Sequence, residues 1–147
     1  MIRRTDYECH PVLQFAKLSG FSNIITTASP RNKELVESLG ATHLIDRSLS
    51  HEKIVEEIKN ITSDPITVIF DAISDATTQN IAYDILAPGG TLALVLASKV
   101  DEAKLTSDKE VYDTFGSVHS GVSKELGLEI YGVLSEYLKS GQIKVRF

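Results

Sequence analysis

Residues 23–47 constrain the fold more than any other part of the sequence. Residues 23–28 (NIITTA) carry the apolar and β-branched side chains of a strand buried on both faces. Ser29 then suits a helix N-cap, with a proline directly after it, and Gly40 suits the C-terminal stop. A second short strand is expected at residues 43–46. Strand, helix and strand of these lengths predict a βαβ unit, which joins two parallel strands by a right-handed crossover.

The same alternation continues along the rest of the chain. Further helices are expected at residues 11–18, 51–62, 75–86 and 124–139, and further strands at 66–73, 91–97 and 111–118. Residues 98–109 are charged and are expected to form a loop or a short helical turn. The pattern predicts a single α/β domain, a Rossmann-like doubly wound sheet that is mostly parallel, with helices on both faces.

Composition sets limits on the class of protein. The chain has 147 residues, 42% hydrophobic and 24% charged, which is typical of one globular domain. The formal net charge of −5 disfavours a nucleic-acid partner, since such a protein needs a basic surface. No segment approaches the length of a membrane span, and the first residues lack the apolar core of a secretory signal. A cytoplasmic location is expected.

Residues that commonly bind metals are sparse. The single cysteine, Cys9, excludes an internal disulfide and any zinc site with several cysteines. The four histidines, His10, His43, His51 and His119, do not pair at helical spacing. No metal site is therefore expected, and no residue is assigned as catalytic.

The end of strand 23–28 carries the most informative polar residues. In a doubly wound sheet the ligand lies beyond the carboxyl ends of the strands, where an acid would accept a hydrogen bond from a free ribose 2′-hydroxyl. No acid stands there; Ser29 is followed by Arg31 and Lys33, and Arg47 ends the neighbouring strand. With the free N–H groups of the helix start, these residues suit a 2′-phosphate. The alternative is that Ser29 is only a cap and that the basic side chains are solvated.

Ordered motifs along the chain resemble one family. Ser29, Lys33, Gly40-Ala41 and Asp46 are similar to the second βαβ of the medium-chain dehydrogenase/reductase superfamily. The motifs that extend the resemblance are Asp71-Ala72-Ile73, Ala87-Pro88-Gly89-Gly90-Thr91-Leu92, Phe115-Gly116-Ser117-Val118 and Tyr137-Leu138-Lys139-Ser140-Gly141-Gln142-Ile143-Lys144. Within the superfamily the chain most resembles the zinc-independent quinone reductases and the fungal enoyl reductases that act in trans with polyketide synthases.

The resemblance implies a function and a set of site residues. It implies NADP(H) as cofactor and hydride transfer to an activated C=C or a quinone, with a small molecule or an acyl thioester as substrate. Ser29 and Lys33 match the positions that hold the 2′-phosphate, and Arg47 stands where this branch commonly has tyrosine. Ile73 and Leu96 would line the cofactor groove. Ser117 would lie near the nicotinamide.

The sequence also departs from the family pattern. Members begin with a GroES-like substrate domain and carry a first strand followed by a glycine-rich turn. Residues 1–10 (MIRRTDYECH) contain no glycine and are charged, so they are left as an unassigned leader. The expectation is a partial domain over residues 1–147 that lacks the central strand. Either the two halves of the sheet close up, or residues 1–10 fill the gap, or a second copy pairs with the open strand edges as a homodimer. Because residues 1–10 are charged, rearrangement or dimerisation is favoured over pairing by residues 1–10.

Two functions remain open from the sequence. The first is the nucleotide-binding domain of an NADPH-dependent enoyl or quinone reductase, expected to be inactive as an isolated chain because nothing positions the substrate. The second is a non-catalytic remnant that acts as a binding or interaction module. The phosphate-site residues favour the first function, and the missing glycine turn favours the second.

Overall fold

The chain folds around one parallel sheet with the strand order β3-β2-β1-β4-β5-β6. A computed structural model describes residues 2–3, 9–114, 117 and 121–145. The strands are β1 (Ile2–Arg3), β2 (Ile25–Ala28), β3 (His43–Asp46), β4 (Val68–Asp71), β5 (Thr91–Leu94) and β6 (Glu110–Asp113). The α-helices are α1 (Cys9–Leu18), α2 (Lys33–Ser38), α3 (His51–Ile61), α4 (Ala76–Ile85) and α5 (Lys124–Lys139), and short 3₁₀ helices span Pro30–Asn32, Glu102–Lys104 and Gly121–Ser123.

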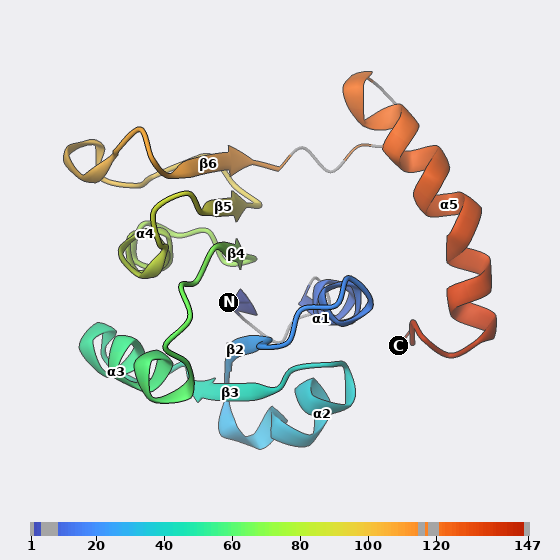
Figure 1. Ribbon diagram of the computed structural model, residues 1–147, viewed down its shortest axis with the longest axis horizontal. Helices are drawn as coiled ribbons and strands as arrows, with labels where there is room; N and C mark the ends of the chain where they lie inside the picture. The colour runs from blue at the N-terminus through green and yellow to red at the C-terminus, as the bar shows by residue number, and fades with distance from the viewer. Residues whose placement is uncertain (1, 4–8, 115–116, 118–120, 146–147) are drawn as a thin grey trace. The chain divides into compact units, whose positions relative to one another are not determined.

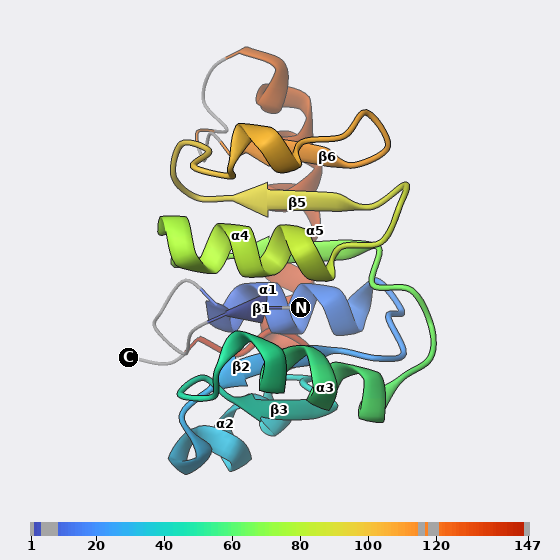
Figure 2. The ribbon, with the colours of Figure 1, turned by 90° about the vertical axis from the view of Figure 1, so that its left-hand side faces the viewer.

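Helices cover both faces of this sheet. Figure 1 shows α1 and α2 on one side and α3 and α4 on the other. Each side has its own apolar core, and Figure 2 views the sheet from the side of α3 and α4. The α3/α4 core is centred on Ile54, Ile69 and Leu92, whereas Leu13 and Val36 anchor the α1/α2 core. The predicted doubly wound α/β class is confirmed.

A short strand occupies the centre of the sheet, and this corrects one expectation. Ile2 pairs with Thr26 of β2 and with Phe70 of β4, in parallel register on both sides. The prediction that residues 1–10 leave this position without a strand is therefore wrong. Pairing uses backbone N–H and C=O groups, which every residue carries, so a charged composition does not prevent it. Because β1 pairs with both β2 and β4, unpaired edges of these strands no longer give a reason to expect a rearrangement or a homodimer.

Most predicted elements are present, and the strands are shorter than expected. β3 and α5 have the predicted bounds, and α3 begins at the predicted residue 51, after an N-cap at Ser50 whose Oγ accepts from the Lys53 N–H at 3.5 Å. β5 ends at Leu94 and β6 at Asp113, where the predictions ran to residues 97 and 118. Part of the latter stretch lies outside the described residues. The residues lost from β5 instead form a loop bonded to α4 by side chains.

The strands on the β4–β6 side have one buried face and one partly exposed face. Val68 of β4 is 48% exposed and Tyr112 of β6 is 55% exposed, whereas Ile69 and Leu92 are fully buried. Successive strand residues point to opposite faces, so the exposed positions share the face away from α4. An apolar run alone does not show whether a helix covers each face of a strand.

The chain divides into two compact units, Met1–Thr114 and Phe115–Phe147. The second unit contains α5, on which Leu126, Leu128 and Tyr131 are exposed. Within the described residues, none of the helices combines the length and the apolar character needed to cross a membrane.

Candidate functional site

A pocket lies beside the carboxyl ends of β2, β3 and β4, where a doubly wound sheet binds its ligand. Its volume is about 490 Å³, and it is lined by Thr27, Arg47, Leu49, Ser50, His51, Ile73, Asp75, Thr77, Thr78 and Ile81. Two of the predicted cofactor residues, Arg47 and Ile73, therefore lie in one pocket. They come from different strand ends and are 26 positions apart in the sequence, so the parallel sheet is what brings them together.

Thr27 is a pocket residue that sequence reasoning missed. It is fully buried, and its Oγ1 has no hydrogen-bond partner. A buried hydroxyl without a partner is destabilising, typically by about 1–3 kcal/mol. A polar ligand in the pocket would satisfy it. The available signal was a threonine inside a strand predicted to be buried on both faces, where an apolar residue packs better.

A tight turn presents Arg47 at the edge of the pocket. The Asp46 Oδ1 accepts from the Ser48 N–H at 2.9 Å and from the Ser48 hydroxyl at 2.8 Å. These two bonds hold the pKa of the Asp46 carboxyl below its usual range, so it is ionised at neutral pH. The Arg47 N–H donates to the Ala28 carbonyl at 3.1 Å, which fixes the turn against the end of β2. The Arg47 side chain itself is exposed.

Ser29 and Lys33 follow β2 at the same edge but do not line this pocket. Ser29 takes the predicted N-cap position, yet its side chain makes no capping hydrogen bond. The helix begins with a 3₁₀ turn, in which the Asn32 N–H donates to the Ser29 carbonyl at 2.9 Å. Lys33 is 66% exposed, and its Nζ lies 3.9 Å from the Glu37 carboxylate. The Lys33 side chain is exposed and Ser29 is half-buried, so an incoming anion can reach both.

The other two predicted residues are Leu96 and Ser117. Leu96 follows β5 and is 56% exposed, and it is not among the pocket residues. Ser117 belongs to the second unit, between residues that the structure does not describe. Its assignment to the nicotinamide stays a prediction.

Buried polar side chains support the loop after β4, beside Ile73. Asp71 is fully buried, and its Oδ1 accepts from the N–H groups of Ile73 and Ser74 at 3.0 and 3.1 Å. Its Oδ2 accepts from the Thr78 hydroxyl. Ser74 has a positive φ of 52°, a conformation uncommon outside glycine, and its hydroxyl donates to the Asp71 carbonyl at 2.7 Å. The position of Ile73 is thus set by hydrogen bonds on both sides of it.

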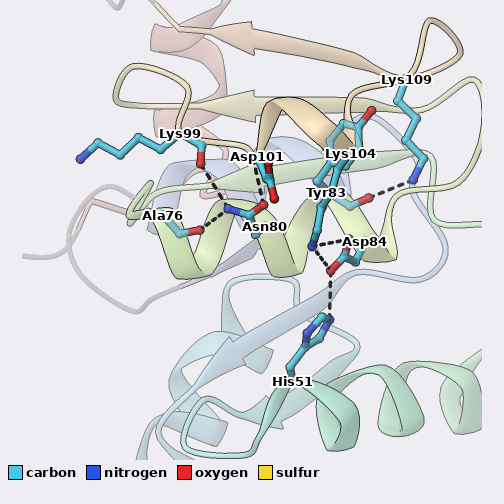
Figure 3. Close-up of polar contacts among 9 residues, drawn as sticks. All are labelled: His51, Ala76, Asn80, Tyr83, Asp84, Lys99, Asp101, Lys104 and Lys109. Carbon is cyan, nitrogen blue, oxygen red and sulfur yellow. Dashed lines mark hydrogen bonds and ion pairs between the residues drawn. The ribbon is translucent and has the colours of Figure 1, made fainter.

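The outer surface of α4 holds the long connection between β5 and β6, as Figure 3 shows. The Asn80 side chain bonds the Lys99 carbonyl at 3.2 Å and the Asp101 N–H at 3.0 Å. The Asp84 carboxylate pairs with Lys104 Nζ at 2.8 Å, and the His51 ring lies 3.8 Å from it. Exposed ion pairs of this kind contribute little stability, typically about 0–1 kcal/mol. The connection is therefore held mainly by the bonds to its backbone.

The connection from β1 to α1 lacks the glycines expected of a glycine-rich turn. It consists of residues 4–8 (RTDYE), which contain no glycine and lie outside the described residues. Close approach of a pyrophosphate to the backbone normally relies on glycine at such a turn. In the described ranges, no group of three or more His, Cys, Asp or Glu residues could hold a metal ion.

Fold, strand order and pocket position define a dinucleotide-binding domain of the doubly wound type. A family model described as zinc-binding dehydrogenase matches residues 10–118. The chain therefore belongs to this family, within the medium-chain dehydrogenase/reductase superfamily of oxidoreductases, as an enoyl-reductase-like nucleotide-binding domain. This confirms the resemblance in the sequence motifs.

Curated relatives are fungal enoyl reductases. A dual trans-enoyl reductase/FAD-dependent monooxygenase of Aspergillus terreus, tazHJ, is 35% identical over 113 residues, which cover 74% of this chain and 16% of the relative. The trans-enoyl reductase fsa3 of a Fusarium species is 36% identical over 78 residues, covering 53% of this chain and 21% of the relative. The chain thus spans less than a quarter of the length of either.

Solved structures share the fold at low sequence identity. A mycobacterial protein complexed with NADPH superposes with a TM-score of 0.78 at 23% identity, over 99% of this chain and 46% of that protein. A quinone oxidoreductase of Pseudomonas syringae gives a TM-score of 0.76 at 22% identity, over 99% of this chain and 46% of the other. These likenesses bear on the fold alone.

Proposed function

We propose that this chain binds NADP(H) at the carboxyl ends of β2, β3 and β4, as the cofactor-binding part of an enoyl or quinone reductase. The observation that carries the proposal is the Thr27 hydroxyl, which is buried in the pocket without a partner. A bound nucleotide offers ribose and phosphate oxygens that would satisfy it. Arg47, at the rim of the same pocket, supplies the positive charge that a phosphate requires.

The residues at this edge fit a 2′-phosphate better than a free 2′-hydroxyl. In the proposal Arg47, Lys33 and Ser29 hold the phosphate, the arginine by charge-assisted hydrogen bonds. Asp46 stands at the end of β3, but its carboxylate is already used by the N–H and hydroxyl of Ser48. It is therefore engaged in the turn and does not replace the missing ribose-binding acid.

The remaining predicted residues concern the other half of the cofactor. Ile73 and Leu96 would line the groove for the nicotinamide side, and Ser117 would lie near the nicotinamide ring. The nicotinamide, when bound, supplies a hydride to an activated C=C or a quinone. The residues of this chain bind and orient the cofactor, and the substrate is a small molecule or an acyl thioester. The relatives named trans-enoyl reductase support this substrate class.

The glycine-free connection at residues 4–8 favours modest affinity. Glycine at a turn of this kind lets a pyrophosphate approach the backbone N–H groups, and residues 4–8 contain no glycine. Binding is then expected to depend mainly on the 2′-phosphate end. The non-catalytic alternative differs in one respect: it predicts that no nicotinamide nucleotide binds.

Calorimetric titration with NADPH and NADH tests the proposal, together with two variants of Thr27. Thr27→Val removes the hydroxyl and keeps the shape, so NADPH affinity should fall about tenfold, as expected for one lost hydrogen bond. The melting temperature of the free protein should not fall, because the lost hydroxyl had no partner. Thr27→Ser keeps the hydroxyl and should retain NADPH binding.

The outcomes separate the two functions. Tighter binding of NADPH than of NADH, weakened by Thr27→Val and retained by Thr27→Ser, supports the proposal. If wild-type protein binds neither nucleotide, the proposal fails and the non-catalytic alternative is favoured. If Thr27→Val leaves NADPH affinity unchanged, the pocket is not where the nucleotide binds.

A further inference from the structure

The side chain of Gln79 connects two loops that are distant in the sequence. Gln79 lies on α4 and is fully buried. Its Nε2 donates to the Ser74 carbonyl at 2.9 Å and to the Ala97 carbonyl at 3.1 Å, and its Oε1 accepts from the Lys99 N–H. One amide thus bonds the loop after β4 and the loop after β5, and each bond is to backbone.

Ser74 makes a second connection between the same loops. Its hydroxyl accepts from the Val95 N–H at 3.0 Å while donating to the Asp71 carbonyl. Ser74 and Gln79 are both fully buried, so these bonds are shielded from water, and losing either partner would leave buried groups unsatisfied. We refer to Ser74 and Gln79, with these bonds, as the loop brace.

The brace does not contribute to the pocket directly. Neither Ser74 nor Gln79 lines it. Each loop, however, presents one predicted cofactor residue next to a braced position: Ile73 precedes Ser74, and Leu96 precedes Ala97. A fixed distance between the two loops therefore fixes the distance between these two apolar side chains.

We propose that Gln79 is a positioning residue that sets the separation of the loops carrying Ile73 and Leu96, and so controls how tightly the nicotinamide half of the cofactor is held. The inference rests on the proposed function. It predicts that loss of the brace affects the adenosine half much less than the nicotinamide half, because Thr27, Arg47 and Lys33 belong to the β2–β3 side of the sheet edge, although Ile73 lines the same pocket as Thr27 and Arg47. A fragment of the cofactor that contains only the adenosine half can therefore measure the binding of that half separately.

The test compares 2′,5′-ADP, which has only the adenosine and 2′-phosphate half, with NADPH. Gln79→Met keeps the approximate volume and removes all three hydrogen bonds. Its affinity for 2′,5′-ADP should stay within about twofold of wild type, while NADPH binding should weaken about tenfold, by loss of pre-organised contacts. Hydrogen exchange gives a second readout: the Lys99 amide should lose protection in Gln79→Met, since its acceptor is gone.

Asn80→Ala is the matched control. Asn80 is the neighbour of Gln79 on α4, and it bonds the backbone of Lys99 and Asp101, but it makes no bond to the loop after β4. Both affinities should stay near wild type in this variant. A general loosening of the β5–β6 connection would instead weaken NADPH in Asn80→Ala as much as in Gln79→Met.

Each outcome decides the inference. Selective loss of NADPH affinity in Gln79→Met, with 2′,5′-ADP retained, supports it. Equal losses for both ligands, or no loss for either, overturn it while leaving the proposed function in place. Wild-type protein that binds neither ligand overturns the proposed function and this inference with it. If Gln79→Met does not fold, Gln79→Glu, which keeps the Oε1 acceptor and loses both donors, takes its place. The expectations for the two affinities are the same, whereas the Lys99 amide keeps its acceptor and should keep its protection.

Discussion

The two halves of the sheet's carboxyl edge are built in opposite ways. At the β2–β3 end, Arg47 and Lys33 are exposed, and Thr27 has a hydroxyl without a partner. At the β4–β5 end, Asp71 and Gln79 are fully buried and each accepts or donates three hydrogen bonds. The polar groups at the β2–β3 end are available to a ligand, whereas those at the β4–β5 end already form hydrogen bonds within the protein.

The difference indicates that the two ends suit different functions. Exposed cations and a hydroxyl without a partner form favourable new interactions when a ligand binds, so they suit recognition. Saturated, buried hydrogen bonds gain nothing from a ligand, but they hold a backbone in one arrangement, and so they suit positioning. Substitutions at the β4–β5 end should therefore change stability and the positions of the loops, whereas substitutions at the β2–β3 end should change the selectivity for NADPH over NADH.

The largest effect is expected on stability, from Asp71. Asp71→Ala leaves the N–H groups of Ile73 and Ser74 without an acceptor in a buried site, and the free energy of unfolding should fall by about 3 kcal/mol or more. Asp71→Asn keeps one oxygen for those two donors and should cost about 1 kcal/mol. Urea denaturation measures both. A loss below 1 kcal/mol in Asp71→Ala would contradict the expectation that buried hydrogen bonds at the β4–β5 end stabilise the fold.

The next largest effect is on selectivity, from Arg47. Arg47→Ala should weaken NADPH about 10- to 100-fold, the range for losing a charge-assisted pair, and change NADH by less than about twofold. Stability should stay near wild type, because the side chain is exposed. Calorimetry with both nucleotides measures the effect. Lys59→Ala, in the last turn of α3, is the charge-matched control and should change neither affinity. Equal losses for NADPH and NADH would refute the 2′-phosphate assignment.

The smallest effect is expected from Lys33. The side chain is 66% exposed and lies 3.9 Å from the Glu37 carboxylate, so solvent and Glu37 both reduce what it offers a phosphate. Lys33→Ala should weaken NADPH by only about two- to fivefold, still with no change for NADH, and the effect should shrink at high salt. A larger loss than in Arg47→Ala would reverse the order of the two cations.

The βαβ unit shows how much of this fold could be predicted from sequence. The strand, the cap at Ser29, the stop at Gly40 and the second strand at His43–Asp46 all depend on local propensity and spacing. Arg47 was predicted as a cofactor residue from its place at a strand end, and Ile73 was predicted from the family resemblance. Their meeting in one pocket follows from parallel strand order.

Thr27, Gln79 and β1 could not be predicted in the same way. The sequence shows that Thr27 is polar, but whether its hydroxyl has a partner depends on what surrounds it. Gln79 looks like any glutamine on an amphipathic helix, and its partners lie up to 20 residues away in the sequence. Residues 2–3 have no strand pattern at all, and their pairing depends on the backbone edges of β2 and β4.

The sequence by itself determined the alternation of helices and strands, the doubly wound class and the family, because these depend on local periodicity and on ordered motifs. The tertiary structure decided which residue fills the centre of the sheet, which polar groups are saturated and which are left for a ligand. Those depend on hydrogen-bond partners and burial, which exist only once distant segments are brought together.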